Sequence, residues 1–143
     1  MAILIDVKKM LIQSCTDMWK RKIIEASDDV DSKLGTYYCV NPLLKKFNMD
    51  IQTLTENERI LITRFRTGSH SLAIEIGRFS NTPRENRLCV CGHGVQSVWH
   101  IFTECQLTRT IVRKNYLNLH DIFEDRNLRN LLILITKILK IPI

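Results

Sequence analysis

The feature that most restricts the fold of this chain is a cluster of three cysteines and one histidine within residues 89–105. Cys89 and Cys91 are separated by one residue, His100 follows after eight more, and Cys105 after a further four. Zinc prefers four sulfur or nitrogen ligands in a tetrahedron, and a Cys3His set is typical of closed structural sites. The spacing predicts one structural Zn²⁺ that organises a loop and the helix after it.

Other interpretations of this cluster stay open at the level of sequence. His93 lies between two glycines beside the Cys89–Cys91 pair and is the rival of His100 as the fourth ligand. The three cysteines can instead be small core residues. One of them can also be the nucleophile of a Cys–His site, although three cysteines around one histidine favour a metal. Cys15 and Cys39 lie outside the cluster and are expected to be isolated thiols.

The sequence gives no indication of secretion or of a membrane span. Asp6 and Lys8 interrupt the N-terminal apolar run before it reaches the length of a signal-peptide core. The most apolar stretch, residues 131–141, contains two lysines and is shorter than the ~20 residues that a bilayer span needs. We therefore expect an intracellular protein, nuclear or cytoplasmic and not secreted, whose cysteines stay reduced and available to a metal.

Positive charge is concentrated around the cluster. The formal net charge is +6, and residues 59–114 hold nine Lys and Arg against three Asp and Glu, with arginine at eight of the nine positions. The guanidinium group pairs with phosphate and stacks on bases, so this segment predicts contacts with nucleic acid. The candidate nucleic-acid-binding residues are Arg64, Arg66, His70, Arg78, Arg84, Arg87, Arg109 and Arg113.

Simpler roles for these residues are also considered. The arginines can form a solvated basic face, and His70 can make a structural hydrogen bond near the start of a helix. Single-strand binding usually adds stacking of bases on aromatic rings. The aromatic residues near the cluster are expected to be core residues rather than base platforms; they are Phe65, Phe79, Trp99 and Phe102.

The residue pattern predicts a mainly α-helical fold. Apolar residues recur at helical spacing from Leu4 to Met18, and residues 55–58 have the spacing of a capping box before a helix that Gly68 would end. Further helices are expected over 71–78, from Ser97, and over 106–120 and 127–140, with a loop over 80–96 and a break over 27–35. The one candidate strand is residues 37–40.

These elements suggest two parts. Residues 1–32 are expected to form an N-terminal amphipathic helical arm, and residues 33–143 a small helical zinc-binding domain. The zinc module, a knuckle-like loop–helix insert, is placed at about residues 87–107.

Four segments carry a family resemblance: SKLGTYY (32–38), RFRTGSHSLAIEIGRF (64–79), TPRENRLCVCG (82–92) and SVWHIFTEC (97–105). In this order they resemble the region that follows the polymerase domain in non-LTR retrotransposon reverse transcriptases. The resemblance implies a tail that engages the element's nucleic acid and places Cys89, Cys91, His100 and Cys105 on the family's zinc ligands. It also places Arg66, Gly68, His70, Arg78 and Arg87 on recurrent positions of the family.

The chain departs from that family in several ways. Gly35 stands where the family usually has Arg, Trp99 where Glu commonly precedes the histidine, and Gln106 where Pro is frequent. No polymerase carboxylate signature and no endonuclease segment is present in the sequence, so we expect no enzymatic activity. Metal-assisted hydrolysis would need an open coordination position, and Glu104, the only carboxylate close by, is expected to face solvent.

The sequence thus favours a zinc-stabilised module that binds RNA or single-stranded DNA, mainly through backbone contacts, and that derives from a reverse-transcriptase tail without its polymerase. One alternative is a zinc-organised protein-interaction module whose apolar helix over Leu128–Ile141 docks on a partner. The other is a remnant reading frame that folds without a selected function.

Overall fold

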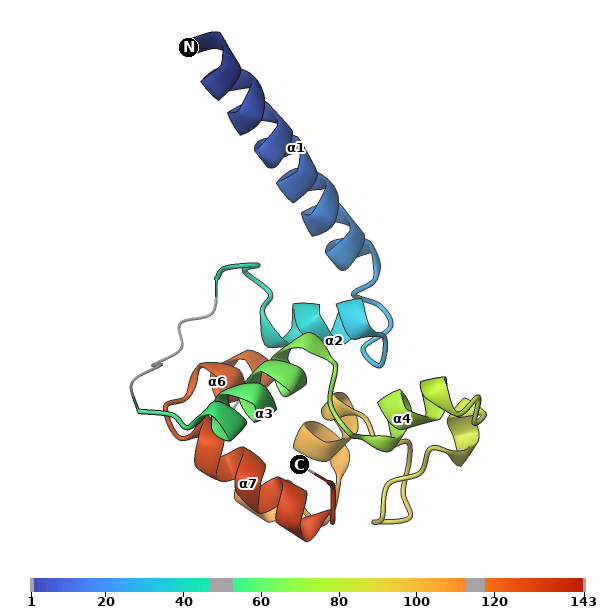
Figure 1. Cartoon of the computed structure of the whole chain (residues 1–143). Coiled ribbons are helices and arrows are strands. Elements are labelled where there is room, and N and C mark those ends of the chain that lie inside the picture. Colours follow the sequence, from blue (N-terminus) through green and yellow to red (C-terminus); the bar gives the residue numbers. More distant parts are fainter. Residues whose placement is uncertain (1, 47–52, 113–117, 143) are drawn as a thin grey trace.

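The computed structural model describes residues 2–46, 53–112 and 118–142, and these are mainly helical, as the sequence predicts (Figure 1). Within them the only β pairing is an isolated bridge between Leu88 and Val95. The elements in chain order are α1 (Ala2–Glu25), α2 (Lys33–Val40), α3 (Glu56–Thr67), α4 (Ala73–Phe79), the 3₁₀ turn η1 (Arg84–Asn86), the π-helical turn η2 (His100–Glu104), α5 (Arg109–Val112), α6 (Leu119–Glu124) and α7 (Leu128–Ile138).

Helix α3 begins and ends as its sequence predicts. The Thr55 hydroxyl accepts a hydrogen bond from the Glu58 N–H, and the Glu58 carboxylate accepts one from the Thr55 N–H at 2.8 Å. This capping box satisfies backbone donors that the first turn would otherwise leave unpaired. At the other end Gly68 takes a φ of +68°, the left-handed conformation that favours glycine at a helix C-terminus.

The strand prediction for residues 37–40 is wrong, because these residues form the second half of α2. Ser32 caps this helix by accepting a hydrogen bond from the Gly35 N–H at 2.9 Å. The helix packs against α3 and α6 and buries Val40, so tertiary packing overrides the β propensity of the segment. A Cβ on Gly35 would lie 1.9 Å from the Asp29 carbonyl oxygen, so the turn before α2 approaches too closely for another residue.

The core lies between α3, α6, α7 and the turn η2. Phe65 of α3 is buried in it, and the Phe102 and Phe123 rings meet edge to face with centroids 5.4 Å apart. Helix α7 buries Leu132 and Ile135 completely in this core. The expected docking surface over Leu128–Ile141 is therefore corrected: its apolar face packs inside the chain itself and is not available to a partner.

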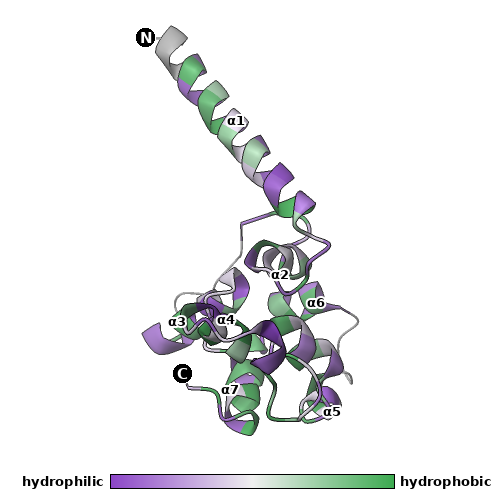
Figure 2. Cartoon of the chain, turned by 90° about the vertical axis from the view of Figure 1, so that its right-hand side faces the viewer, coloured by the Kyte–Doolittle hydropathy of each residue, from purple (hydrophilic) through white to green (hydrophobic). Residues whose placement is uncertain are grey.

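Helix α1 projects from this helical body, and its main contacts are with α2 (Figure 1). A helix over Ala2–Glu25 thus lies within the predicted arm of residues 1–32, and both hydrophobic and hydrophilic residues occur along it (Figure 2). Among its apolar side chains, Val7, Leu11 and Trp19 are each at least 50% exposed. Among the described residues, none of the helices combines the length and apolar character needed to cross a bilayer.

Candidate metal centre

A short hairpin over residues 88–95, closed by the Leu88–Val95 bridge, precedes η2 and positions the first two cysteines. The Cys89 N–H donates to the Gly94 carbonyl at 2.9 Å, and the Gly92 N–H donates to the Cys89 carbonyl at the same distance. Gly92 and Gly94 have φ values of +75° and +92°, which side chains with a Cβ rarely adopt. The two glycines therefore allow a turn tight enough to present both sulfurs to one point.

The turn η2 positions the other two candidate ligands. The Cys105 N–H donates to the His100 carbonyl at 2.8 Å, five residues back, which is the hydrogen bond of a π-helical turn. The turn ends at Cys105, and its widened helical path brings these two residues, five apart in the sequence, onto one side.

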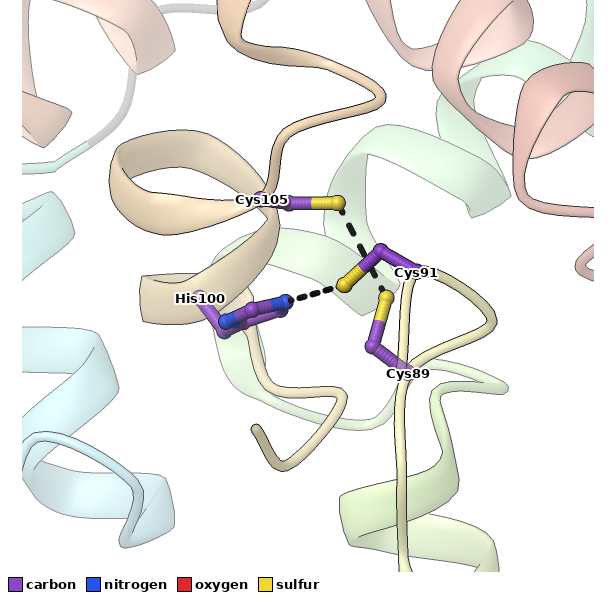
Figure 3. Close-up of side chains that lie close together, drawn as sticks. All are labelled: Cys89, Cys91, His100 and Cys105. Carbon is purple, nitrogen blue, oxygen red and sulfur yellow. Dashed lines mark hydrogen bonds between the residues drawn. The ribbon is translucent and has the colours of Figure 1, made fainter. Parts of the chain in front are cut away.

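Hairpin and turn bring the four side chains together (Figure 3). The Cys89 and Cys105 sulfurs are 3.8 Å apart, and the Cys91 sulfur is 3.3 Å from His100 Nε2. All four ligand atoms lie within 4.8 Å of one another. A zinc tetrahedron places two sulfurs about 3.8 Å apart and a sulfur and a nitrogen about 3.6 Å apart. The four side chains can therefore hold one metal ion.

His93, the rival fourth ligand, is not part of this cluster. Its side chain is exposed, while its backbone N–H lies 3.4 Å from the Cys91 sulfur. A backbone donor at this distance supports a thiolate. His100 is the histidine that completes the set, and Cys15 and Cys39 lie outside it as predicted.

The two buried sulfurs differ in acidity. Burial raises the pKa of the Cys89 thiol to about 12. Burial also acts to raise the pKa of Cys105, but hydrogen bonds from the Leu107 backbone and the Thr108 side chain outweigh it and lower the pKa overall. Because two neighbouring thiolates repel each other, a cation between them would stabilise both in the deprotonated form that metals bind.

A hydrogen bond that the sequence analysis missed orients the His100 ring. The Glu104 carboxylate lies 3.3 Å from His100 Nδ1 and accepts a hydrogen bond from the Trp99 indole N–H at 3.1 Å. A proton on Nδ1 leaves the Nε2 lone pair free for a metal, as is common in metal sites. Glu104 is solvent-exposed as expected, and its position four residues after His100 was the signal for this contact.

Three of the predicted nucleic-acid residues join the elements around the hairpin. Arg87 donates to the carbonyls of Thr82 at 2.8 Å and Ile74 at 3.0 Å, which ties the hairpin to α4. Arg78 pairs with Glu75 and donates to a backbone carbonyl of the turn before α2, and Arg84 forms an ion pair with the Asp31 side chain of the same turn. These arginines remain partly or largely exposed.

Arg66 and His70 are corrected, because both side chains are buried and neither lies on the outer surface. Arg66 Nη2 donates to the Phe123 carbonyl at 2.7 Å, and burial lowers the pKa of its guanidinium. His70 Nδ1 accepts a hydrogen bond from the Leu72 N–H at 3.4 Å, the structural role that the sequence analysis gave as the alternative. Burial lowers the pKa of His70 to about 4, so its ring is neutral at pH 7.

The remaining candidates differ in exposure. Arg64 and Arg109 are exposed, and Arg113 lies outside the described residues. Phe65 and Phe102 are core residues as predicted, and Trp99 is half-buried. The same prediction is wrong for Phe79, which is 82% exposed at the end of α4.

Comparison with known proteins adds no family to this description: no protein-family model, curated protein or solved structure matches the chain.

Proposed function

We propose that the chain is a zinc-stabilised nucleic-acid-binding module that holds one structural Zn²⁺ through Cys89, Cys91, His100 and Cys105. The observation that carries this proposal is the near-tetrahedral spacing of four ligand atoms within the arginine-rich segment. Thiolate and imidazole ligands suit zinc, and four of them leave no position for a substrate or a reactive water. The ion would stabilise the fold rather than catalyse a reaction.

The hairpin needs such a stabiliser because it buries little apolar surface of its own. Leu88 and Val90 on either side of Cys89 are more than half exposed. Structural zinc contributes about 10–16 kcal/mol in small domains, and this free energy becomes folding free energy. The ion would thereby hold the hairpin, η2 and the arginines attached to them in fixed positions.

The charge balance around the hairpin supports binding to phosphate. Glu75 is buried between Lys33 and Arg78, and Glu104 is engaged by His100 and Trp99. Of the three carboxylates in residues 59–114, these contacts leave Glu85 without a described partner.

Among the exposed arginines of the same segment, Arg64 and Arg109 form no ion pair with a described residue, whereas Arg84 pairs with Asp31. Guanidinium contacts to phosphate give affinity with little sequence preference.

The class of nucleic acid that we propose is RNA or single-stranded DNA. The ordered resemblance of residues 32–105 to the tail of non-LTR retrotransposon reverse transcriptases supports this choice, and the chain would be such a tail without its polymerase. The module would then act by binding the nucleic acid of an element rather than by copying or cutting it.

The test is the salt dependence of binding to a fluorescently labelled single-stranded RNA, measured by anisotropy. Contacts from three exposed arginines give a slope of log K against log salt of about −2, at about 0.7 per phosphate contact. Replacing Arg64 or Arg109 with glutamine should reduce the slope by about 0.7 each. The matched control is Arg126→Gln, an exposed arginine outside the segment, which should leave it unchanged. Absence of binding at low salt would reject the nucleic-acid function.

A further inference from the structure

Two adjoining cavities lie next to the C-terminal segment of the described chain. The first, of about 430 Å³, opens between α3, Ser71 and residues 141–142. The second, of about 340 Å³, opens between α4, the hairpin and residues 139–142. Ser71, Ile141 and Pro142 line both cavities, so the two form neighbouring parts of one surface depression.

The described residues that line these cavities include positively charged side chains and no negatively charged ones. Among the described lining residues there is no carboxylate in either cavity, whereas Arg64 lines the first and Arg87 and Lys140 line the second. A surface with cations and no anions favours a negatively charged ligand. The first cavity, called the Arg64 cavity below, combines this charge with a volume in the range of small-molecule sites.

Apolar side chains give the Arg64 cavity much of its wall, namely Ile60, Leu61 and Pro142. The Phe65 and His70 rings also border it, but they pack against each other with centroids 5.4 Å apart and are only 1% and 6% exposed, so the apolar wall would receive a flat ring. His70 is neutral, and its Nδ1 accepts the Leu72 N–H, so the ring proton lies on Nε2. That N–H has no hydrogen-bond partner among the described residues.

We propose that the Arg64 cavity takes one unstacked base of a single-stranded nucleic acid, with the adjacent phosphate on the Arg64 guanidinium. This inference rests on the proposed function and adds a preference for single strands, because a base paired and stacked in a duplex cannot enter a cavity.

The experiment compares three labelled oligomers of equal length at one low salt concentration: single-stranded oligouridylate, an abasic sugar–phosphate strand, and a duplex RNA. The abasic strand keeps the phosphates and loses the bases. Burying roughly 60 Å² of a base against the apolar wall is worth about 1.4 kcal/mol at about 25 cal/mol per Å², so oligouridylate should bind about tenfold more tightly than the abasic strand. The duplex should bind no more tightly than the abasic strand.

Two pairs of variants locate the effect. Ser71→Leu places a larger side chain in the cavity, and Ser69→Leu makes the same change at an exposed position outside the lining. Ser71→Leu should remove most of the tenfold preference, whereas Ser69→Leu should keep it. Arg64→Gln should weaken binding of all single strands, including the abasic one, more than Arg109→Gln weakens it.

The outcomes separate the two proposals. Equal binding of oligouridylate and the abasic strand would overturn the cavity inference and leave backbone binding intact, whatever the folding of the variants. Retention of the preference in a folded Ser71→Leu protein would place the base elsewhere and also overturn it. If no single strand binds at low salt, the proposed function itself fails.

Discussion

The buried imidazole of His70 makes a specific contribution to stability that depends on pH. Its pKa is lowered to about 4 first by burial, against a raising effect of Glu75 and with smaller lowering effects of Arg78 and Lys33. In the unfolded chain the pKa returns to about 6.5. Between these values the unfolded state binds a proton that the folded state does not, so stability falls as the pH falls.

The size of this effect follows from the difference in pKa. A difference of roughly 2.5 pH units corresponds to about 3 kcal/mol at 1.36 kcal/mol per unit, of which about 2 kcal/mol is lost between pH 7 and pH 4.5. The contribution is fully present above pH 6.5 and is lost progressively toward pH 4. The variant His70→Asn keeps a short polar side chain that does not titrate, so it should lack this part of the pH dependence.

The assay is urea unfolding of the wild-type protein and His70→Asn at pH 7 and at pH 4.5. For each protein we take the difference in the free energy of unfolding between the two pH values. Subtracting the difference of the variant from that of the wild type removes the contribution of titrating groups that both proteins contain, including the candidate metal ligands. The variant is expected to lose about 2 kcal/mol less than the wild type over this interval. Identical pH dependence in the two proteins would refute the inference that His70 is buried in its neutral form.

Three further predictions concern single side chains. Gly94→Ala should weaken metal binding, measured by competition with a chelator, because the φ of +92° disfavours a side chain and the new Cβ would lie 3.3 Å from His100 Nδ1. Glu104→Gln should lower metal affinity by up to about tenfold through the His100 ring, whereas Glu85→Gln, an exposed change in η1, should not. Thr55→Ala should lower the free energy of unfolding by about 1 kcal/mol in chemical denaturation, and an unchanged value would mean that the capping box contributes nothing.

Local signals in the sequence were sufficient where the structure depends on neighbouring residues. The capping box at Thr55, the C-cap at Gly68 and the four candidate ligands at residues 89–105 all follow from short spacings. Gly92 and Gly94 also lie within this short segment, and their positive φ values follow from a tight turn that presents two sulfurs to one point.

The sequence did not predict the structure correctly where contacts between distant parts of the chain determine burial or secondary structure. Arg66 has the same local appearance as Arg64, but its guanidinium reaches the carbonyl of Phe123, which is 57 residues away. Residues 37–40 combine aromatic and β-branched side chains typical of strands, yet packing on α3 and α6 makes them helical. The apolar face of α7 has the pattern of either a core helix or a docking helix, and only the buried position of Leu132 distinguishes them.

Native mass spectrometry of the purified chain tests most directly whether one zinc ion holds the hairpin and η2 together. We expect one Zn²⁺ per chain, retained in Cys15→Ser, whose cysteine lies outside the cluster, and lost in Cys91→Ser together with a lower melting temperature. A wild-type chain without bound metal, or a Cys91→Ser variant with unchanged thermal stability, would contradict this expectation.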